Sequence, residues 1–196
     1  MTNTDFYTYL KTPSEERIKD FAEYLMSHYC LDNGTDRYQL LEIEIYNDNM
    51  EYNQTPDDKK MDKNITYPRV KKALDIFYHY TGLDICFESN GKTHSGGILI
   101  RAVKKIDGGE DSFIGGPLKL KDTILNEATS QICAKSLDQA LSVELCDPTI
   151  RIGVHTGRSK KLWRFVVKGY ENKIVTIEGK NKEGFNVLTA KYVNPK

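Results

Sequence analysis

Long apolar runs are missing from this sequence. No segment approaches the roughly 20 apolar residues that a membrane-crossing helix needs, and residues 1–11 are polar and aromatic rather than the apolar stretch of a signal peptide. We therefore expect no membrane span and a cytoplasmic location. Apolar residues still make up 39% of the 196 positions, which is enough for one sizeable core, so residues 1–196 are predicted to form a single domain.

Cysteine pairs and metal-binding spacings are missing as well. The four cysteines, at positions 30, 86, 133 and 146, are scattered without any C-x-x-C motif, so neither a structural zinc site nor a redox pair is indicated. We expect reduced, mostly buried thiols. The four histidines, at positions 28, 79, 94 and 155, show no spacing typical of a metal site or a catalytic triad. The sequence therefore predicts no metal site and gives the histidines no role.

A net charge is also missing, although the charges are unevenly distributed. Residues 1–90 hold 10 Lys and Arg against 17 Asp and Glu, whereas residues 91–196 hold 18 against 11. The densest basic run consists of Arg151, Arg158, Lys160, Lys161, Arg164 and Lys168. Such a run can neutralise phosphates, and a solvated basic strand edge explains it equally well.

Helix signals begin at Thr12. This residue can cap a helix, Pro13 suits the first helical position, and Glu15 can reach back to the cap. Apolar residues then follow at helical spacing, namely Ile18, Phe21, Ala22, Leu25, Met26 and Tyr29. Asn33 and Gly34 are a plausible stop, so a core helix is predicted between these two signals.

Alternating apolar residues predict most of the other elements as strands. The expected strands are 38–46, 83–87, 97–103, 151–154, 161–168, 174–178 and 185–192, with a turn at 89–91. Helices are expected at 118–127 and from Ser136 through Leu141, and the polar segment 47–64 is expected to be a long surface loop. The fold class that follows is α+β, with a curved, mainly antiparallel β-sheet flanked by helices.

The segment 42–46, Glu-Ile-Glu-Ile-Tyr, carries the strongest chemical signal. Strand alternation puts Glu44 and Tyr46 on one face, about 7 Å apart. A nucleobase flipped out of a duplex can stack on the tyrosine ring while the carboxylate orients a water at the sugar carbon. An exposed amphipathic strand with Glu42 and Glu44 on its solvent face explains the same pattern.

Five motifs then occur in a recognisable order. They are the Glu-x-Glu-x-Tyr strand at 42–46, a tyrosine-rich segment running into a glycine and a strand at 77–83, Ile-Leu-Ile-Arg-Ala at 98–102, Gly-Pro-x-Lys-Leu at 116–120, and Arg-x-Gly-Val at 151–154 followed by Lys-Leu-Trp-Arg-Phe-Val-Val-Lys-Gly at 161–169. This order resembles the methylpurine-DNA glycosylases, the 3-methyladenine or alkyladenine DNA glycosylase family. The resemblance covers residues 18–170 and has no counterpart for the C-terminal tail.

The resemblance implies a DNA-repair enzyme of base excision. Such an N-glycosylase hydrolyses the glycosidic bond of alkylated or deaminated purines after base flipping, with double-stranded DNA as its partner and no metal or organic cofactor. Glu44 would be the general base, Tyr46 and Tyr78 would sandwich the flipped base, and Arg101 would lie near the pocket and meet a backbone phosphate. The residues expected on the DNA backbone are Arg158, Lys160, Lys161 and Arg164. We expect a monomer. Without the resemblance, Tyr78 is explained as a half-buried core tyrosine and Arg101 as a surface cation.

The sequence departs from the family at several contacts. The segment 53–56 lacks the family's histidine, Thr81 stands at the wedge tyrosine with Tyr80 beside it as a substitute, and Glu88 replaces an asparagine at the pocket floor. A carboxylate there would repel the charge of Glu44 or raise its pKa. Two further functions therefore remain open. One is a non-catalytic module that binds a nucleobase, a nucleotide or a protein, and the other is an enzyme acting on free nucleosides or RNA.

Overall fold

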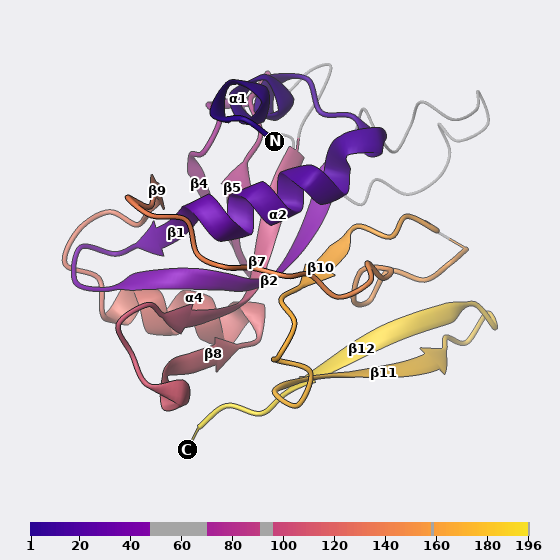
Figure 1. The fold of residues 1–196 in the computed structure, drawn as a ribbon. Helices are drawn as coiled ribbons and strands as arrows, with labels where there is room; N and C mark the ends of the chain where they lie inside the picture. Colours follow the sequence, from indigo (N-terminus) through magenta and orange to yellow (C-terminus); the bar gives the residue numbers. More distant parts are fainter. Residues whose placement is uncertain (48–69, 91–95, 158, 196) are drawn as a thin grey trace.

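The protein is built on one curved antiparallel sheet (Figure 1). The computed structural model describes residues 1–47, 70–90, 96–157 and 159–195. The strands of this sheet are β1 (Tyr29–Asp32), β2 (Arg37–Asn47), β4 (Ile76–His79), β5 (Gly82–Cys86), β7 (Gly96–Lys105), β8 (Phe113–Gly115), β9 (Cys133–Ser136) and β10 (Arg164–Val166). Their order is β4-β5-β7-β2-β1-β9, with β10 paired to β2 and β8 paired to β7. The predicted α+β class with a curved antiparallel sheet is confirmed.

Two smaller strand pairs accompany the main sheet. β11 (Ile174–Lys180) and β12 (Asn186–Tyr192) form a C-terminal hairpin, and β3 (Val70–Lys71) pairs with β6 (Ser89–Asn90). The predicted strands at 174–178 and 185–192 are therefore confirmed. The predicted turn at 89–91 is wrong for Ser89 and Asn90, which form β6, and Gly91 lies outside the described residues. The predicted loop 47–64 also falls almost wholly outside them, since only Asn47 is described and it ends β2.

The N-terminal helices differ from the prediction. An unpredicted helix, α1 (Asn3–Lys11), opens with a capping box between Thr2 and Asp5. Thr12 closes α1 instead of starting the next helix. A short 3₁₀ turn, η1 (Glu15–Arg17), leads into α2 (Ile18–His28), which buries the predicted apolar stripe except its last member, Tyr29, the first residue of β1. The helix ends before Asn33 because residues 29–32 pair with both β2 and β9 as strand β1.

Of the two later helices predicted from the sequence, one is confirmed and one is wrong. α4 (Pro117–Asn126) begins with Pro117 in its first turn, as expected for residues 118–127. It follows a second 3₁₀ turn, η3 (Glu110–Ser112). The predicted helix from Ser136 through Leu141 is wrong. Residues 133–136 form β9, and the amides of Leu137 and Leu141 bond to the carbonyls of His28 and Ser27 at the end of α2. These long-range bonds replace the local bonds of a helix.

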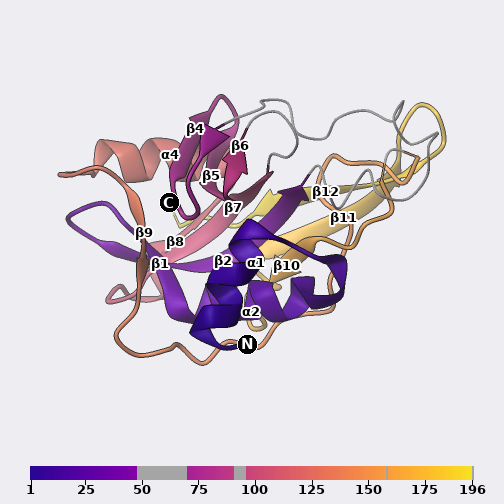
Figure 2. The ribbon, with the colours of Figure 1, turned by 90° about the horizontal axis from the view of Figure 1, so that it is seen from above.

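Helices cover both faces of the sheet. Seen from above, α1 and α2 lie on one side of the central strands and α4 lies on the other (Figure 2). Phe87, just after β5, packs on Phe21 of α2 with ring centroids 5.5 Å apart. By strand alternation, Ile85 and its cross-strand partner Ile98 share this helical face. Glu44, opposite Leu99 of β7, therefore belongs to the other face.

Two further expectations concerned membrane-crossing helices and the cysteines. No helix in the described ranges has the length and apolar character to cross a membrane. All four cysteines are free. Cys30 and Cys86 are buried, Cys146 is half-buried and Cys133 is exposed. The thiols are thus mostly shielded from solvent, as expected, with the exception of Cys133.

Candidate functional site

Strand β2 carries both glutamates into the interior. Glu42 and Glu44 have no exposed surface, so the explanation of 42–46 as an exposed amphipathic strand is wrong. The β2–β7 pairing is irregular on both sides of Glu42, yet Glu42 and Glu44 both contact Arg101. The face that carries Glu44 is covered by residues from the C-terminal third of the chain, which no local pattern in β2 could indicate.

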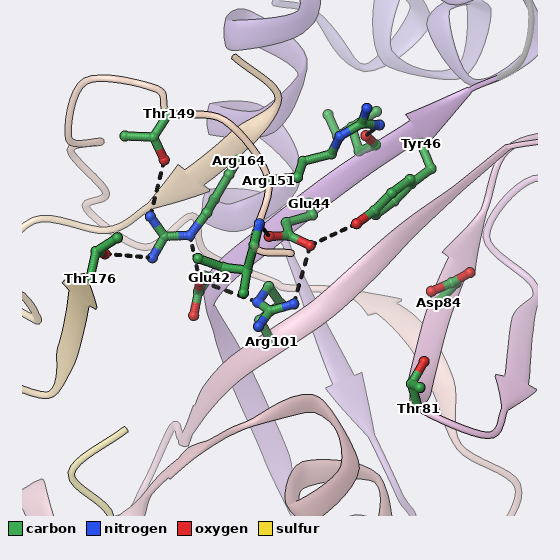
Figure 3. Close-up of polar contacts among 12 residues, drawn as sticks. Glu42, Glu44, Tyr46, Thr81, Asp84, Arg101, Thr149, Arg151, Arg164 and Thr176 are labelled. Carbon is green, nitrogen blue, oxygen red and sulfur yellow. Dashed lines mark hydrogen bonds and ion pairs between the residues drawn. The ribbon is translucent and has the colours of Figure 1, made fainter. Parts of the chain in front are cut away.

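Glu44 is held by three donors. The Tyr46 hydroxyl donates to its Oε2 at 2.9 Å and Arg101 Nη1 donates to the same oxygen at 3.2 Å. The backbone amide of Ile152 donates to Oε1 at 2.5 Å. The structure thus brings together Glu44, Tyr46 and Arg101, as the resemblance implies (Figure 3). Arg101 is only 8% exposed, however, so the expectation that it meets a DNA phosphate is wrong in this conformation.

Glu42 forms the second half of the same cluster. Its Oε1 lies 2.6 Å from Arg164 Nε and 3.4 Å from Arg101 Nε. Arg164 also donates to the hydroxyls of Thr149 at 3.0 Å and Thr176 at 3.2 Å (Figure 3). Because Arg164 is 3% exposed and its donors face inward, the prediction that it contacts the DNA backbone is corrected. It is a structural partner of Glu42.

Arg151 is a member of the site that the sequence did not identify. Its side chain is fully buried, and its guanidinium lies 4.5 Å from the Tyr46 ring and 5.2 Å from the Trp163 ring. Arg151 Nη1 also donates to the carbonyl of Ile45 at 3.0 Å. Its sequence signals were its place in the basic run and in the Arg-x-Gly-Val motif, and neither indicated burial against Tyr46. A cation on the Tyr46 face occupies one surface on which a flipped base was expected to stack.

Burial controls the protonation of this cluster. It raises the pKa of Glu44 above its ordinary value, although the Arg101 guanidinium and the Ile152 amide both oppose the shift. Burial also raises the pKa of Tyr46 well above its ordinary value, and the neighbouring Glu44 carboxylate adds to this effect. Tyr46 therefore remains a hydrogen-bond donor to Glu44. The expected effect of Glu88 is not found, because Glu88 is exposed and the carboxylate that neighbours Glu44 is Glu42.

The predicted base sandwich is wrong. In the register of the sheet, Phe77 lies opposite Asp84, Asp84 opposite Leu99, and Leu99 opposite Glu44. Residues directly opposite one another share a face, so Tyr78, next to Phe77, points to the other face from Glu44 and Tyr46. Tyr78 is 39% exposed there.

The rest of the predicted DNA-contacting set is dispersed. Tyr80 is 81% exposed in the turn between β4 and β5. Lys161 forms an ion pair with Glu15 and lies 5.5 Å from the Trp163 ring. Lys160 is exposed, and Arg158 lies outside the described residues. The basic run is therefore not one continuous surface, because two of its arginines are internal.

A second polar group was missed because the histidines showed no familiar spacing. His79 Nε2 lies 3.1 Å from Asp84 Oδ1, and His79 Nδ1 lies 2.9 Å from Thr81 Oγ1. Asp84 and Thr81 lie on the β4–β5 hairpin, apart from the Glu42–Glu44 cluster (Figure 3). The His-x-Thr-x-x-Asp spacing could have been recognised only by assuming a two-residue hairpin turn after His79.

The site thus contains two different arrangements. The Glu42–Glu44 cluster, in which the two glutamates pair with Arg101 and Arg164, is buried. The second group, His79 with Thr81 and Asp84, lies at an accessible turn. Among the described residues, no group of three or more His, Cys, Asp and Glu side chains could hold a metal ion. In comparisons with known proteins, no protein-family model matches the chain and no curated protein matches its sequence.

Proposed function

We propose that the chain binds double-stranded DNA through the β4–β5 hairpin. The observation that carries this proposal is the 81% exposure of Tyr80 at the tip of a hairpin that belongs to the main sheet. Lys121 Nζ donates to the carbonyls of His79 and Tyr80 at 3.1 and 3.0 Å, which ties the tip to α4. A ring presented on a supported turn can stack on bases, and Tyr80 adjoins the position of the family's wedge residue.

Charge near the hairpin supports the same proposal. Lys119 and Lys121 both project from the first half of α4, and Lys119 is exposed. The Lys121 ammonium lies at the backbone carbonyl of Tyr80, so it can approach a phosphate while Tyr80 meets the bases. Residues 70–90, which include the hairpin, hold two Lys against three Asp and Glu, a small part of the acidic excess of residues 1–90. Most of that acidic excess lies elsewhere in the first half of the chain, including the segment 48–69 outside the described residues.

Replacing Tyr80 with alanine is expected to weaken binding to a duplex by about tenfold. The reason is that stacking of one base on an aromatic side chain contributes about 1 to 3 kcal/mol. Fluorescence anisotropy with a duplex containing one mismatch, measured at low and at moderate salt, gives the comparison. Tyr7→Ala is the matched control, since Tyr7 is a 43% exposed tyrosine on α1. Equal affinities for native protein and Tyr80→Ala, or no binding at low salt, would overturn the proposal.

A second candidate function is base excision by the same scaffold. Its specific support is that Glu44, Tyr46 and Arg101 converge within hydrogen-bonding distance. In the conformation described, Glu44 has no exposed surface, so a water could reach it only after the covering residues Ile152 and Tyr192 move. Base excision is therefore our second candidate, behind DNA binding. It requires that Ile152 and Tyr192 move so that water can reach Glu44.

Single-turnover base release tests this second function. If the chain is a glycosylase, it should release hypoxanthine or 3-methyladenine from a duplex, and Glu44→Gln should slow release by about 100-fold or more because a positioned general base contributes about that factor. Binding of DNA should be unchanged in the variant. Binding without release by the native chain would favour the non-catalytic module. Release from free nucleosides but not from DNA would favour the nucleoside enzyme.

A further inference from the structure

The β4–β5 hairpin holds a hydroxyl, an imidazole and a carboxylate in one hydrogen-bonded chain. Thr81 Oγ1 lies 2.9 Å from His79 Nδ1, and His79 Nε2 lies 3.1 Å from Asp84 Oδ1. Asp84 is 6% exposed, whereas Thr81 is exposed. The exposed Thr81 hydroxyl is therefore connected through the His79 imidazole to the buried Asp84 carboxylate.

The partners determine where the proton lies on His79. An ionised carboxylate only accepts hydrogen bonds, so Nε2 of His79 carries the hydrogen that points to Asp84. Nδ1 is then an acceptor, and the Thr81 hydroxyl donates to it. This is the arrangement that activates a hydroxyl nucleophile, with a base to take its proton and a carboxylate to orient the base.

The turn and the packing of the hairpin hold Thr81, His79 and Asp84 in place. Tyr80 and Thr81 form a two-residue turn, because His79 ends β4 and pairs with Gly82, the first residue of β5. A Cβ added at Gly82 would meet Leu99 Cδ1 and Pro117 Cβ at 3.0 Å, so the hairpin packs closely on β7 and on the start of α4. The turn that carries Thr81 is held against a rigid part of the protein.

A cation lies at the same turn. The Lys121 ammonium contacts the carbonyl oxygens of His79 and Tyr80 at 3.1 and 3.0 Å. Two of its three hydrogens are used by these contacts. The ammonium thus lies at the backbone of the residue that precedes Thr81, and a positive charge at such a turn stabilises the oxyanion that develops when a hydroxyl attacks a carbonyl.

We propose that Thr81 is a catalytic nucleophile for acyl transfer from small activated esters, with His79 as its general base and Asp84 as the residue that positions His79. In the first step Thr81 Oγ1 attacks the carbonyl carbon, and its proton passes to His79 Nδ1. The bond to the leaving alcohol then breaks, and that alcohol takes the proton from His79. Water, deprotonated by His79, attacks the acyl-threonine ester in the second step and releases the acid while Thr81 regains its proton. This activity involves neither Glu44 nor DNA.

The probe is 4-nitrophenyl acetate with the full chain. Nitrophenolate release follows the rate, and intact mass with peptide mapping locates the acetyl group. The native chain should carry acetyl on Thr81. Thr81→Ala and His79→Gln should slow release by about 100-fold, and Thr81→Ser should retain it. Thr4→Ala is the control, because Thr4 is an exposed threonine on α1.

Asp84→Asn tests the positioning residue. If Asp84 only orients His79, kcat should fall while KM and the thermal midpoint stay close to native values. Thr81 is exposed, so its truncation leaves the core intact and a lost rate reports the chemistry. The proposal is overturned if acetyl maps to lysines or the N-terminus without Thr81, or if Thr81→Ala reacts like the native chain. A failure of DNA binding leaves this result unaffected.

Discussion

Replacing Arg164 with methionine should lower the free energy of unfolding by about 3 to 5 kcal/mol. Removal of one partner from a buried ion pair leaves the other charge without compensation, and losses of about this size are typical. Arg164 Nε lies 2.6 Å from Glu42 Oε1, and both side chains are shielded from water. The variant also removes the donors to Thr149 and Thr176. Urea unfolding at neutral pH measures the effect.

Two further variants make this measurement specific. Lys160→Met removes an exposed cation four residues before Arg164, and it should change stability by no more than about 0.5 kcal/mol. The double variant Glu42→Met with Arg164→Met removes both charges and should recover much of the loss, because apolar replacement of a whole buried pair is often close to neutral. A loss below about 1 kcal/mol for Arg164→Met would show that the cluster is not a structural ion-pair network.

The second large loss of stability is expected from Gly115→Ala. A Cβ at this position would lie 2.4 Å from Tyr192 Cδ1 and 2.7 Å from Cγ, so the tyrosine ring must move. Its displacement breaks the bond from Arg101 Nε to the Tyr192 hydroxyl, which is 3.0 Å long. Asn194, which bonds both the amide and the carbonyl of Gly115, is disturbed as well. We expect a loss of about 1 to 3 kcal/mol, the usual cost of overpacking.

Urea unfolding and amide hydrogen exchange measure this change. Exchange of the β12 amides should accelerate in Gly115→Ala, because β12 carries Tyr192 onto the cluster. Gly109→Ala is the matched control, since a Cβ there meets nothing within 4 Å and the residue has φ −62°. If Gly109→Ala lost as much stability as Gly115→Ala, the close contact with Tyr192 would not explain the effect.

Local patterns predicted the elements whose signals lie within a few residues. The apolar spacing of 18–29 found α2, the Gly-Pro start found α4, and alternation found β2, β5, β7, β11 and β12. Local patterns failed where a distant segment competed. The capping pattern at Ser136 did not produce a helix because residues 133–136 pair with β1. A short polar helix, α1, gave too little periodicity to be recognised, although Phe6, Tyr9 and Leu10 bury its inner side.

Strand alternation is enough to predict that Glu44 and Tyr46 are neighbours on one face. That this face is closed depends on contacts with distant parts of the chain. The amide of Ile152 reaches Glu44 across 108 residues, and Arg164 reaches Glu42 across 122. Hydrophobic periodicity records which side chains share a face, whereas burial of a charge depends on which distant groups compensate it. The same reason explains why a basic run that suggested a DNA surface contributes two arginines to the interior.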